Sequence, residues 1–127
     1  MKKTAVSTDR GPKAIGPYSQ AIKVPGLMFV SGQTPLDPAT GELVGTEINA
    51  QTARVLDNVK GIVESQGRTM ADVVKTTVFL KDMNDFAAMN KIYASYFPEP
   101  APARSTIQVA RLPKDALVEI EAIIVLE

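Results

Sequence analysis

The clearest structural signal in this sequence is the segment Ala116-Leu117-Val118-Glu119-Ile120-Glu121-Ala122-Ile123-Ile124-Val125-Leu126. Successive side chains of a β-strand point to opposite faces of its sheet. One face of this strand therefore receives Ala116, Val118, Ile120, Ala122 and Ile124, and the other receives Leu117, Glu119, Glu121 and Ile123. The first set is wholly apolar and predicts a core-facing surface. The second mixes carboxylates with aliphatic side chains, which is typical neither of a core nor of plain solvent.

Upstream segments supply the first part of a fold around this strand. Residues 20–24 and 27–32 are short β-type runs separated by Pro25-Gly26, which suits the centre of a type II turn and predicts a hairpin. Residues 33–47 are rich in proline and glycine, and so long a loop indicates either a functional role or a short strand within it. Apolar residues then recur at helical spacing over residues 48–63, and Gly67 lies where the helix should end.

A strand followed by a second helix is expected next. Residues 73–80 are rich in β-branched side chains, and Asp82 can cap a helix whose apolar face is Phe86, Met89, Tyr93, Tyr96 and Phe97. Pro98, Pro100 and Pro102 end that helix, and residues 105–110 form another strand. The order β, β, α, β, α, β, β predicts a single domain over residues 1–127 with an α+β fold, a mixed sheet carrying both helices on one face.

The strands also predict a second, partly polar sheet face. Alternation places Lys75 and Thr77 opposite Val74, Thr76 and Val78, and places Arg104, Thr106 and Gln108 opposite Ser105, Ile107 and Val109. If these polar sides coincide with the side of Glu119, the face suits a subunit interface that holds a site. The sequence does not fix this, because a one-residue slip in pairing would send Arg104 and Glu119 to opposite faces.

Composition limits the chemistry. Fourteen basic residues balance fourteen acidic ones, which disfavours nucleic acid and anionic membranes as partners. The sequence contains no histidine, cysteine or tryptophan, so imidazole bases, thiolate nucleophiles and thiolate zinc sites are excluded. The basic start is followed by a polar stretch at residues 7–12 and not by an apolar one, and the longest apolar run is far too short to cross a bilayer. We therefore expect a cytoplasmic protein without a membrane partner.

Four motifs carry a resemblance to a known family: Ala14-Ile15-Gly16-Pro17-Tyr18-Ser19-Gln20-Ala21, Ser31-Gly32-Gln33, Pro102-Ala103-Arg104-Ser105, and Val109-Ala110-Arg111-Leu112-Pro113-Lys114-Asp115. In order and spacing the chain resembles the RidA/YjgF reactive-intermediate deaminase family over nearly its whole length. The resemblance implies a chorismate-mutase-like fold assembled as a homotrimer with sites between subunits. It also implies hydrolysis of 2-imino acids, such as 2-iminobutanoate and 2-iminopropanoate, to 2-keto acids and ammonia. No cofactor or metal is expected.

The resemblance also assigns residues to roles. Arg104 falls on the family's carboxylate-binding arginine, Glu119 on its water-holding glutamate and Tyr18 on its pocket tyrosine. Three further residues match positions near the pocket: Ser31, Gly32 and Asn90. Thr106 stands where many members have cysteine, and its backbone N–H can serve as the cysteine's does.

These residue types suit such a reaction. A guanidinium matches a carboxylate with two parallel N–H donors, and an iminium carbon is electrophilic enough to need only a positioned water and a proton acceptor. Partial burial would raise the pKa of Glu119, and a nearby Arg104 would oppose that rise.

Simpler interpretations remain open for the same residues. Arg104 could be a surface arginine, Tyr18 a packed aromatic, and Glu119 a solvent-facing residue like Glu121, which has the same parity. Ser31, Asn90 and Thr106 could likewise be ordinary strand or helix residues.

Two other functions also compete with catalysis. One is a non-catalytic binding module that senses a keto acid or amino acid, although the presence of both Arg104 and Glu119 favours catalysis. The other is a ribonuclease or translation inhibitor. It is disfavoured because the sequence lacks histidine, an acidic metal cluster and a basic aromatic RNA platform.

Overall fold

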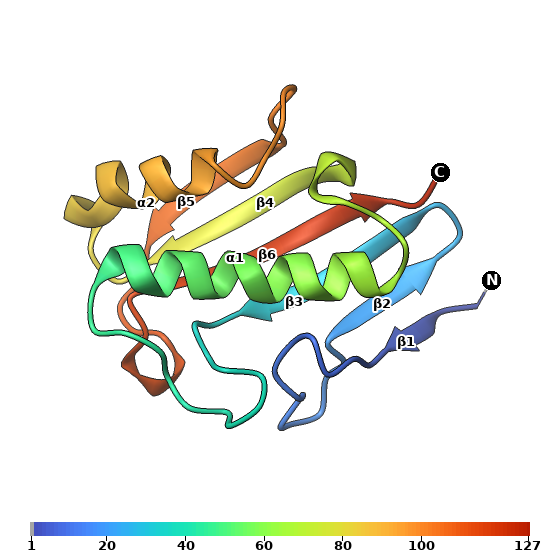
Figure 1. Cartoon of the computed structure of the whole chain (residues 1–127), viewed down its shortest axis with the longest axis horizontal. Coiled ribbons are helices and arrows are strands. Elements are labelled where there is room, and N and C mark those ends of the chain that lie inside the picture. The colour runs from blue at the N-terminus through green and yellow to red at the C-terminus, as the bar shows by residue number, and fades with distance from the viewer. Residues whose placement is uncertain (1) are drawn as a thin grey trace.

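The structure, a computed structural model, describes residues 2–127. One mixed sheet has the strand order β1-β2-β3-β6-β4-β5 (Figure 1). The strands are β1 (Thr4–Val6), β2 (Ala21–Val24), β3 (Leu27–Gln33), β4 (Val73–Leu80), β5 (Ala103–Gln108) and β6 (Val118–Val125). The helices are α1 (Ile48–Ser65) and α2 (Phe86–Ala94), and short 3₁₀ turns lie at Met70–Asp72, Met83–Asp85 and Pro113–Asp115.

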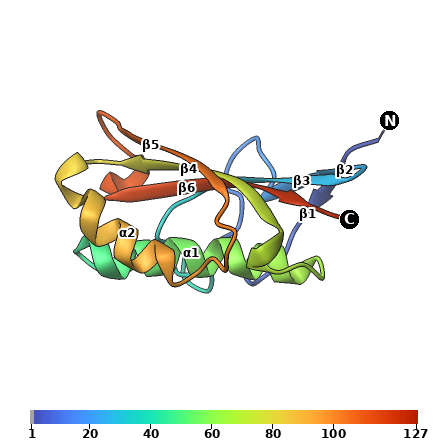
Figure 2. The same ribbon diagram turned by 90° about the horizontal axis from the view of Figure 1, so that it is seen from above.

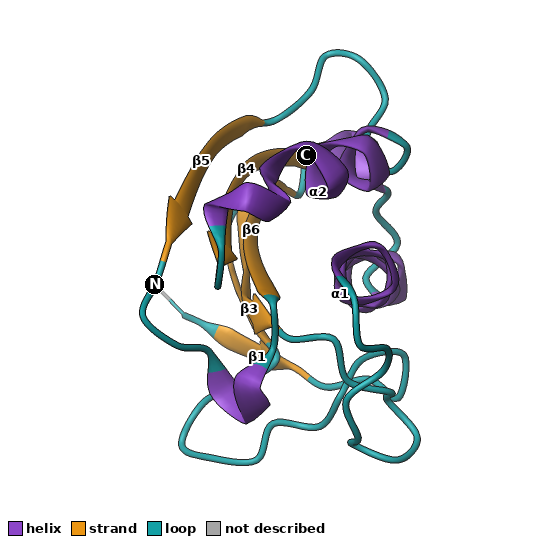
Figure 3. Cartoon of the chain, turned by 90° about the vertical axis from the view of Figure 1, so that its left-hand side faces the viewer, coloured by secondary structure: helices purple, strands orange, loops and turns teal. Residues whose placement is uncertain are grey.

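Both α-helices cover the same face of the sheet, as predicted, so that neither α1 nor α2 lies on the opposite face (Figures 2 and 3). The apolar stripe of α1 packs on β6 and β3, and Val55, Leu56, Val59, Ile62 and Val63 are fully buried there. Along β6 the predicted core set Ala116, Val118, Ile120, Ala122 and Ile124 is buried in full. Alternation in this one strand therefore separates the core from the open face.

The predicted hairpin and first helix are present. β2 and β3 pair antiparallel around Gly26, whose φ of 86° is the value that the third position of a type II turn requires. α1 ends as predicted before Gly67, which has a φ of 76° and donates its N–H to the carbonyl of Glu64 at 3.0 Å. Within residues 33–47 there is no further strand, only a single bridge between Leu36 and Leu43.

Three details differ from the sequence prediction. The strand β1 was not expected, because three residues are too few to show a periodic pattern. Asp82 caps the 3₁₀ turn Met83–Asp85 that leads into α2, accepting a hydrogen bond from the N–H of Asn84. α2 ends at Ala94, earlier than Pro98, because Ser95 donates both its N–H and its hydroxyl to the carbonyl of Ile92 and tightens the last turn.

The strand register places Arg104 and Glu119 on opposite faces of the sheet. β5 runs parallel to β4 with Arg104 beside Thr76, whose hydroxyl hydrogen-bonds to Tyr93 of α2 at 2.7 Å, so Arg104 faces the helices. Glu119 lies beside Phe79 and faces the open side. The polar sides of these strands therefore coincide only in part. Lys75 and Thr77 share the open face with Glu119, whereas Arg104 lies on the helix side. The edge strand β5 lies beyond the apolar core, so its helix-facing side can be polar.

A bulge causes a second departure in β4. Val74 is 43% exposed, although alternation grouped it with the buried Thr76 and Val78. The register of β4 against β6 shifts between Val73 and Lys75, and this extra residue turns Val74 outward.

Candidate active site

The first part of the site is a cavity of about 460 Å³, and we call it the glutamate cavity. Four of the predicted site residues line it: Tyr18, Ser31, Gly32 and Glu119. Residues from three loops form much of the remaining wall: Pro12, Lys13 and Ile15, then Thr34 and Leu36, then Pro113 and Lys114. Three further polar side chains, Gln20, Gln33 and Glu121, also line the cavity. The structure thus brings together four of the seven site residues that the sequence predicted.

Glu119 is half-buried near the start of β6, between β3 and β4. Burial raises the pKa of its carboxyl group above the ordinary value, and the neighbouring carboxylate of Glu121 raises it further. The expected opposition from Arg104 is not among the causes of the shift, because that residue lies on the other face of the sheet. The site therefore holds a carboxyl group that binds its proton more tightly than a solvated glutamate does.

Gly32 makes room for this carboxylate. A Cβ placed on Gly32 would collide with Oε2 of Glu119 and would stand 2.9 Å from the carboxyl carbon. Real Cβ atoms essentially never approach a neighbour so closely. A glycine at this position is therefore a condition for the observed conformation of Glu119.

Ser31 and Tyr18 lie beside the same cavity. The hydroxyl of Ser31 donates to the carbonyl of Ser19 at 2.6 Å, which ties β3 to the segment before β2. Tyr18 is 52% exposed, so it is not a packed aromatic, and its hydroxyl accepts a hydrogen bond from the N–H of Ile15 at 3.3 Å. The phenol is thus held at the cavity while about half of the residue stays exposed.

The second part of the site is a cleft of about 330 Å³ beside α2, and we call it the arginine cleft. Its lining includes Asn90, Tyr93, Phe97, Pro102 and Arg104. The guanidinium carbon of Arg104 lies 4.8 Å from the ring centroid of Tyr93 and 5.5 Å from that of Phe86. Stacking over aromatic faces stabilises the cation and fixes its orientation.

Arg104 has no ion-pair partner within residues 2–127. Its charge lowers the pKa of Tyr93, but burial has the larger effect and raises that pKa overall. Two polar oxygens nearby are buried and lack a hydrogen-bond partner among the described residues, Oδ1 of Asn90 and Oγ1 of Thr106. The unpaired cation of Arg104 favours a bound anion. The unpaired Oδ1 of Asn90, which can only accept, favours a hydrogen-bond donor on the same ligand.

Sequence reasoning missed several residues of both parts. Phe86 and Tyr93 were predicted only as part of the apolar face of a helix. Their contact with Arg104 depends on which side of β5 faces α2, and tertiary structure determines that side. Lys114 lines the glutamate cavity, where it and Asp115 have positive φ values of 55° and 57°. The family-like motif over residues 109–115 was the signal that could have drawn attention to this turn.

Within residues 2–127 there is no group of three acidic side chains that could hold a metal ion. Neither helix in that part of the chain is long and apolar enough to cross a membrane.

The family is decided by comparison with known proteins. The family model described as Endoribonuclease L-PSP matches residues 8–126 of this chain. The chain belongs to this family, the YjgF/RidA family. A RutC family protein of Pyrococcus abyssi is 56% identical over 123 residues, covering 97% of each chain. The 2-iminobutanoate/2-iminopropanoate deaminase of Escherichia coli is 51% identical over 128 residues, covering 98% of each chain.

Solved structures of YjgF/RidA proteins agree with the fold. Escherichia coli TdcF, whose crystal structure was solved with bound serine, is 45% identical in sequence to this chain. The match covers 98% of this chain and 99% of the TdcF chain, with a TM-score of 0.93. The predicted chorismate-mutase-like α+β fold is therefore confirmed. The relatives include deaminases, so membership also brings the chain into a family with that activity.

Proposed function

We propose that this protein hydrolyses 2-imino acids, with 2-iminobutanoate and 2-iminopropanoate as substrates, in sites that form between the subunits of a homotrimer. The observation that carries this proposal is the division of the chemistry between two faces of one sheet. A ligand in the arginine cleft of one chain cannot reach Glu119 of the same chain, because the sheet separates them. A second copy that brings its glutamate cavity against the arginine cleft would place its Glu119 beside the ligand that Arg104 binds.

Arg104 is proposed to bind the carboxylate of the substrate. Its guanidinium is oriented by Tyr93 and Phe86 and has no carboxylate partner within residues 2–127. A bidentate bond to a planar carboxylate would satisfy the charge and fix the imine carbon in space. Asn90 lines the same cleft, and the family resemblance assigns the backbone N–H of Thr106 to the site, so that both would supply further polar contacts.

Glu119 is proposed to hold and deprotonate the attacking water. A carboxyl group with a raised pKa is a better proton acceptor than a solvated one. Water adds to the iminium carbon, Glu119 takes the proton that water loses, and the carboxyl group returns it to the amine nitrogen. The C–N bond then breaks as the C=O bond forms, and Glu119 passes the proton of the hydroxyl group to the departing ammonia. The iminium acid and one water thus give one 2-keto acid and one ammonium ion. Tyr18 and Ser31 are proposed to line the pocket around this step.

The open sheet face supports assembly with further copies. Phe29 and Ile107 are exposed there by 42% and 46%, and a hollow of about 140 Å³ lies between Lys75, Thr77 and Glu121. Large apolar side chains exposed on a sheet face that neither α-helix covers favour a protein partner there. If each copy offers its arginine cleft to one neighbour and its glutamate cavity to the other, the contacts are heterologous. Such contacts close as a ring of three when each copy is rotated by a third of a turn from the one before.

A cytoplasmic location belongs to the same proposal. The imino acids in question are released by pyridoxal-phosphate-dependent dehydratases, so the enzyme should share their compartment. No nucleic acid or membrane partner is part of this proposal.

A sensing role is the second candidate, and one observation favours it. A relative, Escherichia coli TdcF, has been solved with bound serine. An amino acid carries the carboxylate that Arg104 is suited to bind, but it has no imine to hydrolyse. A protein that only senses such ligands would need Arg104 and would not depend on the raised pKa of Glu119.

The test generates 2-iminobutanoate in place with a threonine dehydratase and follows 2-ketobutanoate formation while a trapping amine competes for the imine. Wild type is compared with Arg104→Ala and Glu119→Gln. Loss of the rate gain in both folded variants supports hydrolysis. No gain by wild type with any of several imino acids contradicts the proposal, and serine binding that survives Glu119→Gln would then support sensing. Cleavage of a labelled RNA by wild type would point instead to a ribonuclease.

A further inference from the structure

One buried side chain holds the N-terminal wall of the glutamate cavity. Gln20 precedes β2 and is only 4% exposed. Its Oε1 accepts a hydrogen bond from the N–H of Thr8 at 2.7 Å. Its Nε2 donates toward the carbonyl oxygens of Thr8, Gly11 and Pro12 at 3.0, 3.2 and 2.8 Å. A single amide therefore contacts both ends of residues 8–12, a segment with no strand or helix of its own.

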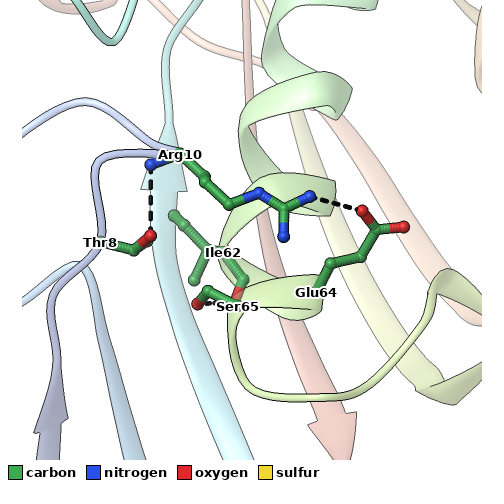
Figure 4. Close-up of polar contacts among 5 residues, drawn as sticks. All are labelled: Thr8, Arg10, Ile62, Glu64 and Ser65. Carbon is green, nitrogen blue, oxygen red and sulfur yellow. Dashed lines mark hydrogen bonds and ion pairs between the residues drawn. The ribbon is translucent and has the colours of Figure 1, made fainter.

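The same segment is pressed against α1 on its other side. A Cβ on Gly61 of α1 would collide with the carbonyl of Arg10, and a Cβ on Gly11 would stand 2.8 Å from Cγ1 of Ile62. Arg10 reaches along the helix to Glu64, with 2.7 Å between Nη2 and Oε1 (Figure 4). That ion pair is exposed and contributes little by itself. Residues 8–12 are therefore held between α1, which their backbone contacts closely, and the side chain of Gln20.

This segment leads directly into the candidate site. Pro12, the last residue of the segment, lines the glutamate cavity, and so do Lys13, Ile15 and Tyr18, which follow it. Gln20 itself lines the same cavity. The backbone of Gln20 is part of the same support, because its carbonyl accepts the N–H of Ser31 at 2.9 Å. The residue thus connects the wall that carries Tyr18 to the strand that carries Ser31 and Gly32.

We propose that Gln20 is a positioning residue for the glutamate cavity, whose amide fixes residues 8–12 and through them the wall that carries Tyr18. The effect on catalysis rests on the proposed function, whereas the effect on the wall does not. An apolar side chain of the same length would fill the space and leave one N–H and three carbonyls without their partner. Buried polar groups rarely remain unpaired, so the segment would move outward to water.

The test compares Gln20→Met with a matched control, Gln66→Met. Gln66 also uses both ends of its amide, accepting from Lys23 Nζ at 2.7 Å and donating to Ser65 Oγ at 3.0 Å, but it does not line the cavity. Native-state trypsin cleavage after the exposed Lys13 is followed by mass spectrometry. Losing these hydrogen bonds should accelerate that cleavage by about tenfold or more in Gln20→Met, and by less than about twofold in the control.

Imine hydrolysis supplies the second readout. A displaced wall should raise KM by about tenfold and change kcat less, since Arg104 and Glu119 are untouched. A merely structural loss of folded protein would lower kcat and leave KM unchanged, which would overturn the positioning role. Unchanged cleavage after Lys13 in folded Gln20→Met would overturn it as well. Faster cleavage together with no hydrolysis by wild type would support the wall contact and contradict the proposed reaction.

If Gln20→Met does not fold, the unaltered protein provides the measurement. The Thr8 amide should exchange its hydrogen at least about a hundredfold more slowly than in an unstructured peptide, because its partner Oε1 is held by Gln20. Exchange at the peptide rate would overturn the proposal.

Discussion

Replacing Gly32 by alanine should disable Glu119 while leaving the fold intact. The new Cβ would stand 2.9 Å from the carboxyl carbon of Glu119, whereas ordinary contact begins at 3.4 Å. The carboxyl carbon must therefore retreat by at least about 0.5 Å, and the nearer oxygen must move further. The colliding atoms are the far end of a flexible side chain, so the backbone of β3 and β6 can stay where it is.

The size of the effect follows from that displacement. A misplacement of about 1 Å at a reacting group can cost about a hundredfold in rate. We therefore expect Gly32→Ala to lower kcat by about a hundredfold, equivalent to about 2.7 kcal/mol in activation free energy. The free energy of unfolding should fall by only about 1 kcal/mol, because the clash is relieved by one side chain.

The assay is the coupled imine hydrolysis with urea denaturation as the check on folding. Gly16→Ala is the matched control, since its Cβ would meet only the Tyr18 ring at ordinary contact distances of 3.4 and 3.5 Å. That variant should retain its rate within about threefold. Wild-type kcat in a folded Gly32→Ala protein would refute the role given to Glu119.

Three further changes probe the supports of the site. Gly61→Ala places a Cβ against the backbone of Arg10 and should lower the free energy of unfolding by about 2 kcal/mol, measured by urea denaturation. An unchanged urea midpoint would contradict the close packing of these two segments. Asn58→Leu removes the bonds to the carbonyls of Thr34 and Leu36 at 3.2 and 2.8 Å, with an expected loss of about 2 kcal/mol by the same method. Glu119→Gln should increase stability at pH 7. The pKa of Glu119 is raised in the native state, so stability falls as pH rises above the ordinary value of 4.5, and the gain of the variant should vanish below about pH 4. A gain that persists at low pH would show that charge burial is not its cause.

The parts of the fold that the sequence predicts correctly are those with a local pattern. Alternation over residues 116–126 separates the core from the open face because one set of side chains is wholly apolar and the other contains Glu119 and Glu121. Pro25-Gly26 and Gly67 mark a turn and a helix end because their backbone conformations are local properties. The assignment of Glu119, Tyr18, Ser31 and Gly32 to a common cavity came from motifs, and the structure does place them together.

What the sequence could not predict depends on contacts between distant segments. Alternation along β5 is correct, but only pairing with β4 determines which of its sides meets α2, so the face of Arg104 stayed open. The role of Gln20 was equally hidden, because four hydrogen bonds to residues 8–12 leave no periodic trace. Gly32 and Gly61 are needed because a Cβ at either position would collide with a residue of a distant segment. The sequence around each glycine does not reveal that neighbour.

The most direct test of the account mixes two inactive variants, Arg104→Ala and Glu119→Gln. After equal amounts are dissociated together and reassembled, about a quarter of the sites should combine an intact Arg104 from one chain with an intact Glu119 from its neighbour. The mixture should then recover about a quarter of the wild-type imine hydrolysis rate, while each variant taken alone through the same procedure stays inactive. Mixed assemblies that form without any recovery would contradict a site shared between two subunits.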